Sequence, residues 1–445
     1  MSQNILELPA PKADPQFGHL LEYDRDPIGF WTLCAKEYGE IVPLNFGEMS
    51  VCFISNPQLI EKVLHEKNTF IKGEDYQILG DIFGKGLVTS DGDLWKHQRK
   101  LIQPLFLQER IANYAKIMVN YTEKMLNNWS DKEEIDVHAE MMRLTLNIAM
   151  KAIFDLDLTE ADAKTIAEAF DLAMEWYENM REQGFIYDPN NPTEADLRYK
   201  KAIDRVDKAI YKIIQTRRKN KQNSGDLLSL LIDMKDENGK KMSDRQVRDE
   251  AATMILAGHE TTANTLSWTW MLLAQNPQVR AKLQQELKEV LGNKKPTAAD
   301  YNRLNYTKMV IKESMRLYPA VAELSRQTTR EYNLGGYQIP ANCTVMMCQW
   351  VNHRNPDYFP DPETFNPDRW ANDLEKKLPK GVYFPFGDGQ RICIGKGFAL
   401  MEAVLLLATI SQKFTLNLLP EHPILPQPSI TLRPEKGIKV ILNKR

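Results

Sequence analysis

The sequence predicts a mainly α-helical fold with a small β lobe, built as a single domain over residues 1–445. Helical periodicity dominates from about residue 56 to residue 291. Strand patterns occur near the N-terminus and again in the last third of the chain. No repeat, low-complexity segment or strong linker divides the sequence. We therefore expect one domain, although 445 residues exceed the usual size of one.

The strand patterns are short and bounded by turn residues. Residues 41–46 and 49–55 alternate around Gly47-Glu48, which predicts a β-hairpin. Strand character returns over residues 332–348 and 429–442. Between these regions, clusters of Gly, Pro, Asn or Ser predict breaks in the helical pattern near residues 80–86, 184–192 and 220–225.

Composition and charge exclude several classes of protein. A net charge of −3 gives no basic face for nucleic acid. Five scattered cysteines form no visible disulfide framework. Residues 1–8 do not resemble a signal peptide, and no apolar run reaches the roughly 18 residues of a membrane span. We therefore expect a cytoplasmic, monomeric protein.

The most specific local pattern surrounds Cys393, in the segment Phe-Pro-Phe-Gly-Asp-Gly-Gln-Arg-Ile-Cys-Ile-Gly. Gly387 and Gly389 allow a tight loop with positive φ. A helix beginning near Ile394 would direct its N–H groups at the sulfur and favour the thiolate. The segment predicts a cysteine thiolate ligand to haem iron, with Arg391 placed for a haem propionate. The alternatives are an inert buried cysteine and, less consistent with the lack of neighbouring ligands, a structural zinc site.

A second pattern lies within a long predicted helix. Ser243 and Gln246 form a capping box, and the helix is expected to continue to Asn276, where Pro277 follows. Its middle reads Ala-Gly-His-Glu-Thr-Thr over residues 257–262. Glycine inside a helix costs about 1 kcal/mol relative to alanine, so a functional reason is expected there. An oxygen-binding pocket is one interpretation and a Ser/Thr-rich bend in a buried helix is the other.

Two weaker spacings complete the set. Trp95 and Arg99 are four residues apart and share a helix face. Glu313 and Arg316 have the i,i+3 spacing of a side-chain pair. Cation–π packing and an ordinary surface ion pair are the alternative explanations of these two patterns.

Taken together, these motifs resemble those of the cytochrome P-450 haem-thiolate monooxygenases, from about Pro9 to the C-terminus. The absence of an N-terminal anchor resembles the soluble prokaryotic members. The resemblance implies a triangular domain in which haem b lies between a long distal helix and a proximal cysteine loop. It also implies O₂ as co-substrate and NAD(P)H as the electron source, through a ferredoxin- or flavodoxin-type donor and its reductase. Lys96, Lys100 and Lys396 would give that donor a basic docking patch.

The resemblance assigns roles to particular residues. Cys393 would ligate the iron, and Glu260 and Thr261 would be the catalytic acid–alcohol pair that delivers protons to dioxygen. Glu313, Arg316 and Arg369 would form a structural salt-bridge network, although Asp368 stands where the family often has Glu. The other expected haem contacts are Trp95, Arg99, Ala257, Gly258, Arg326, Phe386, Arg391 and Gly395.

The resemblance also points to an apolar substrate pocket, which suggests a lipophilic substrate such as a fatty acid, terpenoid or steroid that is hydroxylated or epoxidised. An apolar stripe at helical spacing is also typical of ordinary core. Two alternatives to the monooxygenase are a peroxygenase or isomerase of the same fold, and a non-enzymatic haem-thiolate sensor. The expected substrate contacts are Ile78, Phe83, Met180, Phe185, Met254, Val321, Glu323, Leu324 and Ile430.

Overall fold

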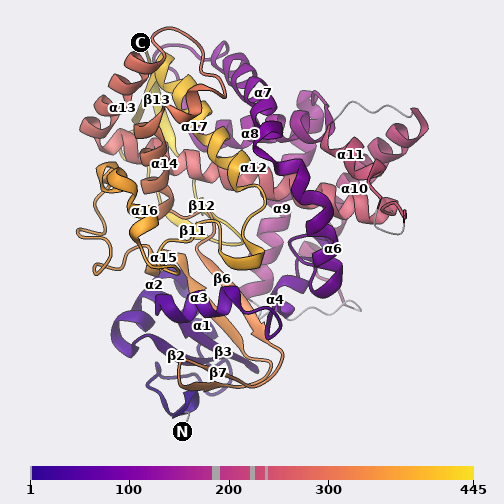
Figure 1. Cartoon of the computed structure of the whole chain (residues 1–445), viewed down its shortest axis with the longest axis vertical. Coiled ribbons are helices and arrows are strands. Elements are labelled where there is room, and N and C mark those ends of the chain that lie inside the picture. Colours follow the sequence, from indigo (N-terminus) through magenta and orange to yellow (C-terminus); the bar gives the residue numbers. More distant parts are fainter. Residues whose placement is uncertain (1–2, 183–190, 221–225, 236–238) are drawn as a thin grey trace.

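The computed structural model describes residues 3–182, 191–220, 226–235 and 239–445. Helices fill most of the molecule, and the largest β-sheet lies with the N-terminal helices at one end (Figure 1). This is the mainly helical fold with a small β lobe that the sequence predicts. The expected breaks at residues 184–192 and 220–225 fall largely outside the described residues.

The helices follow one another in chain order. They are α1 (Leu20–Arg25), α2 (Pro27–Leu33), α3 (Pro57–His65), α4 (Glu74–Gln77), α5 (Gly80–Phe83), α6 (Gly92–Ile102), α7 (Gln108–Leu126), α8 (Val137–Phe154), α9 (Glu160–Glu182), α10 (Glu194–Asn220), α11 (Leu227–Asp233), α12 (Asp244–Gln275), α13 (Pro277–Val290), α14 (Asn305–Leu317), α15 (Gln349–Asn352), α16 (Leu374–Lys377) and α17 (Lys396–Lys413).

The strands are short. They are β1 (Gln3–Asn4), β2 (Ile41–Phe46), β3 (Met49–Ile54), β4 (Phe70–Ile71), β5 (Glu134–Asp136), β6 (Glu323–Thr328), β7 (Tyr332–Leu334), β8 (Tyr337–Ile339), β9 (Thr344–Cys348), β10 (Phe414–Leu418), β11 (Pro426–Pro428), β12 (Leu432–Pro434) and β13 (Lys439–Lys444).

The predicted hairpin is confirmed as antiparallel β2 and β3, with Ile41 opposite Ile54. β3 then pairs in parallel with β9, so the hairpin becomes part of a five-stranded sheet in the order β2-β3-β9-β6-β4. The sheet therefore joins strands from both ends of the chain. Strand β6 contains Leu324 and Arg326, and both residues line the central cavity.

Two expected segments differ in detail. The strand character predicted over residues 429–442 is present as two strands, β12 and β13, because Gly437 adopts a φ of +67° and turns the chain. A Cβ on Gly437 would lie 2.0 Å from an Asp136 carboxylate oxygen, so side chains larger than glycine are excluded there. The expected break at residues 80–86 contains the short helix α5, which ends at Gly84.

Helix α12 crosses the interior and organises the helical part. The predicted capping box is confirmed, since the Ser243 hydroxyl accepts from the Gln246 N–H and the Gln246 side chain accepts from the Ser243 N–H. The helix ends at Gln275, one residue before the expected end, and Pro277 begins α13. Helices α8, α14 and α17 pack around α12, which explains why most of its residues are buried.

Within the described ranges, none of the helices combines the length and apolar character that crossing a membrane requires.

Candidate active site

The cysteine segment forms a compact loop before α17. The Gly387 N–H donates to the Phe384 carbonyl and the Cys393 N–H donates to the Phe386 carbonyl, both at 2.9 Å. Gly387 and Gly389 have φ of +65° and +67°, which confirms the positive φ expected for both. A Cβ on Gly389 would lie 2.1 Å from the Leu64 carbonyl oxygen, so this loop packs directly on the end of α3.

The electrostatics at Cys393 differ from the expectation. The helix begins at Lys396 rather than near Ile394, and burial raises the pKa of the Cys393 thiol. Hydrogen bonding by the Gly395 and Lys396 backbone and the charge of Arg99 oppose this increase. The helix N-terminus therefore acts in the predicted direction, but the cost of desolvating a thiolate is larger.

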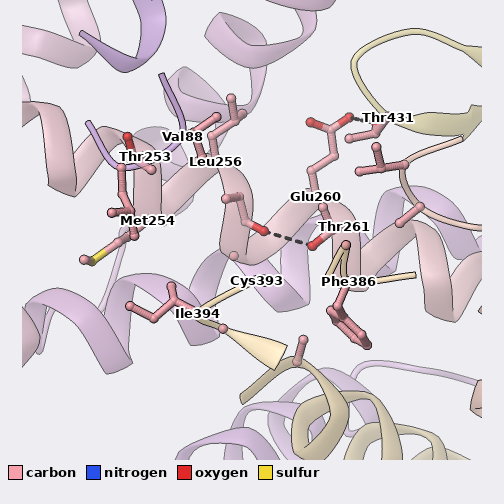
Figure 2. Close-up of a pocket in the computed structure, with 18 of the residues that line it drawn as sticks. Val88, Thr253, Met254, Leu256, Glu260, Thr261, Phe386, Cys393, Ile394 and Thr431 are labelled. Atoms are coloured by element: carbon pink, nitrogen blue, oxygen red, sulfur yellow. Dashed lines mark hydrogen bonds between the residues drawn. The ribbon is translucent and has the colours of Figure 1, made fainter. Parts of the chain in front are cut away.

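A cavity of about 440 Å³ lies between the cysteine segment and α12. Cys393 and Ile394 form one wall, and Met254, Leu256, Glu260 and Thr261 of α12 lie across from them (Figure 2). Cys393 is exposed to this space, whereas the four other cysteines are buried. The sulfur is thus the accessible thiol of the chain and faces a largely apolar cavity.

The middle of α12 contributes a bent, open surface to the cavity. The Thr261 hydroxyl donates to the Ala257 carbonyl at 2.9 Å, which is the back-bond expected from the sequence. A Cβ on Gly258 would meet nothing within 4 Å, so this turn borders open space. The resulting recess lies beside a threonine hydroxyl, as an oxygen pocket requires.

Glu260 points away from the Thr261 hydroxyl in this structure (Figure 2). Its carboxylate accepts from the Thr431 hydroxyl at 2.6 Å and lies 3.4 Å from the Arg433 guanidinium. The side chain is 1% exposed. The pair that sequence spacing places side by side is therefore separated into a cavity-facing hydroxyl and a buried carboxylate bound to the C-terminal β region.

Basic and aromatic side chains line another part of the cavity wall: Trp95, Arg99, Arg326 and Arg391. The expected propionate donor Arg391 instead donates to the Ser90 carbonyl at 2.8 Å and pairs with Asp91. Its guanidinium also stacks on Trp95, 4.0 Å from the ring centroid. Arg99 donates to the Ile392 carbonyl at 2.9 Å. A guanidinium has five N–H donors, so both arginines keep donors for a further acceptor.

These side chains fit a planar haem with acidic side arms. Burial lowers the pKa of Arg391 to about 10, and the nearby positive charge of Arg326 acts in the same direction. Two partly desolvated cations at one wall favour an anionic partner between them. With one exposed sulfur below and an open helix turn above, Cys393 would ligate the iron and Arg99, Arg326 and Arg391 would hold the carboxylates.

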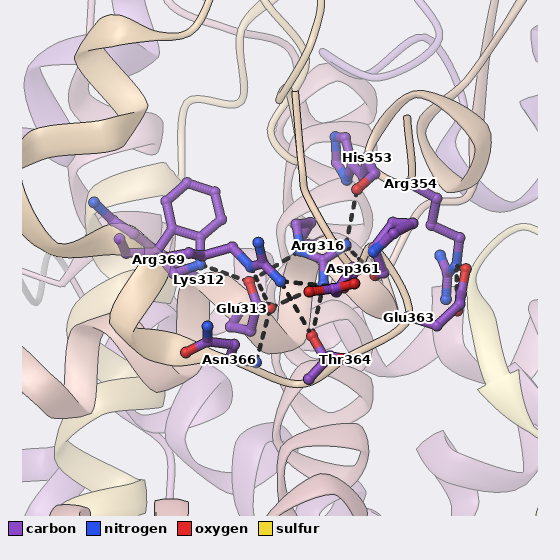
Figure 3. Close-up of polar contacts among 12 residues, drawn as sticks. Lys312, Glu313, Arg316, His353, Arg354, Asp361, Glu363, Thr364, Asn366 and Arg369 are labelled. Atoms are coloured by element: carbon purple, nitrogen blue, oxygen red, sulfur yellow. Dashed lines mark hydrogen bonds and ion pairs between the residues drawn. The ribbon is translucent and has the colours of Figure 1, made fainter. Parts of the chain in front are cut away.

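The expected salt-bridge network is present (Figure 3). Arg316 donates to both Glu313 oxygens, and Arg369 donates to Glu313 Oε1 at 2.8 Å. Glu313 and Arg316 are both fully buried. Trp370 supplies a further N–H to Glu313 at 2.8 Å. The geometry is that of a buried, fully hydrogen-bonded cluster and excludes an ordinary surface pair.

This cluster connects to the cysteine segment through His353. Arg316 donates to the His353 carbonyl at 3.0 Å, and the His353 ring accepts the Phe384 N–H at 3.0 Å. Burial and the neighbouring charges of Arg316 and Arg354 lower the pKa of His353 to about 3, so the ring is neutral and can accept. The network therefore supports the first residue of the cysteine loop.

Only some of the predicted substrate contacts line the cavity. Phe83, Met254, Val321, Leu324 and Ile430 line the cavity. Ile78, in the turn between α4 and α5, and Met180 of α9 pack in the adjoining hydrophobic core, and Phe185 lies outside the described residues.

Glu323 is the acidic residue among the predicted substrate contacts, and its carboxylate is hydrogen-bonded to other side chains. The Glu323 carboxylate accepts from Tyr23 at 2.6 Å and from the Trp31 indole. The residue borders the cavity, but its charge is bound to the N-terminal aromatic cluster. Glu323 is therefore placed at the cavity, as predicted, with its carboxylate directed to Tyr23 and Trp31.

Several lining residues were missed by sequence reasoning. They come from helical segments whose inner faces read as ordinary core: Leu105, Phe106, Tyr114, Ala149, Ala152 and Ile153. An apolar stripe gives the same signal whether it faces a core or a chamber, so no local pattern distinguishes them.

Comparison with known proteins agrees with this geometry. The family model described as Cytochrome P450 matches residues 8–442, and the chain belongs to that family. It is 35% identical to cyclooctatin synthase of Streptomyces melanosporofaciens, covering 95% of this chain and 93% of that protein. It is 32% identical to cyclooctat-9-en-7-ol 5-monooxygenase of the same organism, covering 92% of this chain and 90% of that protein.

A solved structure shows the same fold. The crystal structure of the cytochrome P450DA heme domain aligns with a TM-score of 0.89 at 27% sequence identity, covering 98% of both chains.

The pentalenene oxygenase of Streptomyces avermitilis is 29% identical, covering 98% of this chain and 97% of that protein. The protein is therefore an oxidoreductase, a cytochrome P450 monooxygenase, and family membership implies a haem-thiolate cofactor and O₂.

Proposed function

We propose that this enzyme hydroxylates or epoxidises a lipophilic terpenoid with O₂, and that a separate ferredoxin- or flavodoxin-type protein supplies electrons from NAD(P)H. The observation that carries the proposal is the largely apolar cavity bounded by the Cys393 sulfur and the open turn at Gly258. Similar proteins are named for pentalenene and cyclooctat-9-en-7-ol, by their names an unsaturated hydrocarbon and an unsaturated alcohol. These names favour a terpenoid over a fatty acid or steroid.

The residues around the cavity have different roles in the reaction. A haem bound through a thiolate supplies the cleavage of the O–O bond. Cys393 holds the iron, and Arg99, Arg326 and Arg391 fix the orientation of the cofactor. Phe83, Val321 and Leu324 surround the substrate and exclude water. The Thr261 hydroxyl, which donates to the Ala257 carbonyl in this structure, would turn to donate into the recess at Gly258 during the reaction.

We assign the proton supply to Glu260. Its carboxylate is buried, adjoins Thr261 in sequence and is held by Thr431 and Arg433. Arg433 also lies 3.4 Å from Asp171, whose side chain is 67% exposed. Because a guanidinium keeps its proton, Arg433 is not itself a relay, and we propose that water reaching Glu260 beside Arg433 and the exposed Asp171 recharges the carboxylate between turnovers.

Lys96, Lys100 and Lys396 support docking of an acidic electron donor near the cysteine side. Lys396 begins α17 three residues after Cys393, and Lys96 and Lys100 lie on α6 next to Trp95 and Arg99. Lys96 pairs with Asp93 and Lys396 lies 3.7 Å from Glu375. Such exposed pairs are weak and can be exchanged for a partner's carboxylates.

The proposal is tested by turnover with defined partners. The haem-loaded enzyme, a ferredoxin, its reductase and NADPH are combined with panels of terpenoids, fatty acids and steroids. We expect one oxygen atom to be added to a terpenoid, together with NADPH-dependent O₂ consumption. Product formed only with added peroxide would indicate a peroxygenase instead, and oxidation confined to fatty acids or steroids would overturn the substrate class.

Thr261→Ala is expected to uncouple the reaction while the protein stays folded. Without the hydroxyl, proton delivery to dioxygen is lost, and general acid catalysis of this kind contributes about 100-fold or more. We expect a comparable loss of product per NADPH and a corresponding release of hydrogen peroxide, both measured in the same assay. The matched control is Thr145→Ala on α8, where the hydroxyl makes the same back-bond to Met141 at 2.9 Å. Undiminished coupling in Thr261→Ala would exclude the assigned role.

A further inference from the structure

Two adjacent carboxylates on α12 hold the loop that follows α5. Asp249 Oδ2 accepts the Lys85 N–H at 3.0 Å, and Glu250 Oε2 accepts the Leu87 N–H at 3.1 Å. Both bonds join residues far apart in the sequence. Alternate backbone N–H groups of one loop thus end on neighbouring carboxylates of one helix turn.

Glycines bring this loop into direct contact with α12. A Cβ on Gly84, which has a φ of +55°, would lie 2.0 Å from Asp249 Oδ1. A Cβ on Gly86 would lie 2.1 Å from the Thr253 hydroxyl oxygen. The loop that carries Val88 accordingly passes beside the Thr253 turn of α12 (Figure 2). The loop contributes backbone N–H groups to this contact, and Asp249 and Glu250 contribute the acceptors. The strength of the contact therefore depends on these two carboxylates.

The same loop forms part of the cavity wall. Phe83, Leu87 and Val88 all line the cavity. At its far end the loop is bound to the cofactor side, because Arg391 donates to the Ser90 carbonyl at 2.8 Å. Release of the carboxylate contacts would free the Lys85 and Leu87 N–H groups, while the Gln98 amide, at 2.6 Å, still holds the Lys85 carbonyl and the Lys72 ammonium still holds the Val88 carbonyl.

Glu250 is unusual for a carboxylate in this position. It is 0% exposed, and its Oε1 has no hydrogen-bond partner among the described residues. Burial raises the pKa of Glu250 to about 8, and the charge of Asp249 acts in the same direction, while the Leu87 N–H opposes it. A buried acid with a single N–H partner is held more easily in its neutral form.

The surrounding charges are otherwise paired. Asp249 is bound to Arg248 at 3.1 Å, and Arg248 also pairs with Asp207 of α10. The Lys85 residue on the loop is exposed to solvent. Asp249 is therefore joined to α10 through Arg248, whereas Glu250 has no cationic partner among the described residues.

We propose that Asp249 and Glu250 form a carboxylate latch that positions the loop Gly84–Val88 against the substrate, with Glu250 as a pH-sensitive member that holds the loop when protonated. The proposal deepens the proposed function, since it rests on that cavity being the substrate site. Both carboxylates are positioning residues, because they act through the loop rather than by touching the reacting atoms.

The direction of the pH effect follows from linkage. An open loop exposes Glu250 to water, where its pKa returns toward the ordinary value of about 4.3. The closed loop binds the proton more tightly, so closure is strongest at low pH and weakens as pH rises toward 8. The opening equilibrium is expected to increase by up to about tenfold per pH unit between about pH 5 and pH 8, and then to level off.

Hydrogen exchange of the Lys85–Val88 amides tests the latch in the haem-loaded full chain. Rates are measured by mass spectrometry from pH 6 to pH 9 and corrected for intrinsic exchange. The wild type is expected to lose protection with rising pH, whereas Glu250→Gln keeps an amide acceptor and stays protected throughout. Glu250→Ala leaves the Leu87 N–H unpaired and is expected to lose about ten- to a hundredfold of protection at pH 6, where the wild-type loop is closed, and to show no dependence of protection on pH.

A second measurement tests whether the loop affects ligands in the cavity. The dissociation rate of 4-phenylimidazole is monitored by the absorption of the haem. This rate is expected to rise in Glu250→Ala and to match or fall below the wild-type rate in Glu250→Gln. Equal protection in wild type and Glu250→Ala, or the same pH profile in wild type and Glu250→Gln, would overturn the latch. A dissociation rate common to all variants would remove its positioning role. Neither measurement involves turnover, so failure of the proposed oxygenation would be seen separately.

Discussion

Cys393→Ser is expected to abolish monooxygenation and the spectrum that marks a thiolate-ligated haem. The alkoxy or hydroxyl oxygen of serine donates less electron density than a thiolate, and this density favours O–O cleavage. The reduced protein with carbon monoxide should lose its strongly red-shifted Soret band, and product formation should fall to background. Absorption spectra and the NADPH-driven assay measure the two effects.

The fold should survive this substitution. The loop is fixed by backbone, through the Cys393 N–H to Phe386 carbonyl bond at 2.9 Å and the positive φ of Gly387 and Gly389. We expect the free energy of unfolding of the haem-free protein to change by no more than about 1 kcal/mol. Cys348→Ala, which changes a buried cysteine of β9, is the control and should keep the red-shifted band. A red-shifted band in Cys393→Ser would exclude Cys393 as the ligand.

Glu313→Ala is expected to give the largest loss of stability. It would leave Arg316, which is fully buried, and the nearly buried Arg369 without their common carboxylate. Breaking a buried ion pair in this way costs about 3–5 kcal/mol, a large fraction of the stability of a typical domain. Urea unfolding should show this loss directly. Haem content should fall with it, because Arg316 fixes His353 and the His353 ring accepts the Phe384 N–H of the cysteine loop.

A neighbouring ion pair provides the control. Asp368 pairs with Lys282 at 2.6 Å, but their side chains are 51% and 56% exposed. Asp368→Asn should therefore change the free energy of unfolding by about 0.5 kcal/mol or less and leave haem content intact. Asp368 stands where the family often has Glu, and its exposure explains why this position tolerates Asp in place of Glu. Equal stability in Glu313→Ala and Asp368→Asn would show that the network is dispensable.

Features determined by neighbouring residues were predicted well. The Ser243–Gln246 box set the start of α12, and Pro277 set its end to within one residue. Gly47 marked the turn between β2 and β3. The positive φ of Gly387 and Gly389 followed from the same reasoning. Caps and turns depend on a few adjacent residues, so their physics is visible in the sequence.

Features that depend on distant partners were predicted less well. Glu260 adjoins Thr261 in sequence, yet Thr431 and Arg433 turn its carboxylate elsewhere. Glu323 borders the cavity as predicted, yet its carboxylate is hydrogen-bonded to Tyr23 and Trp31. In both cases a hydrogen bond from another part of the chain decides where the charge lies.

The sequence by itself determined the helical class, the long central helix, the single accessible thiolate candidate and the Glu313–Arg316 pair, because each is encoded over a few adjacent residues or one helical turn. Only the tertiary structure decided which apolar faces enclose the cavity, where Arg391 and Glu260 direct their charges, and how Asp249 and Glu250 hold the loop at Gly84. Burial, and the pKa of a buried acid such as Glu250, are properties of what surrounds a side chain, and most of those neighbours are distant in sequence.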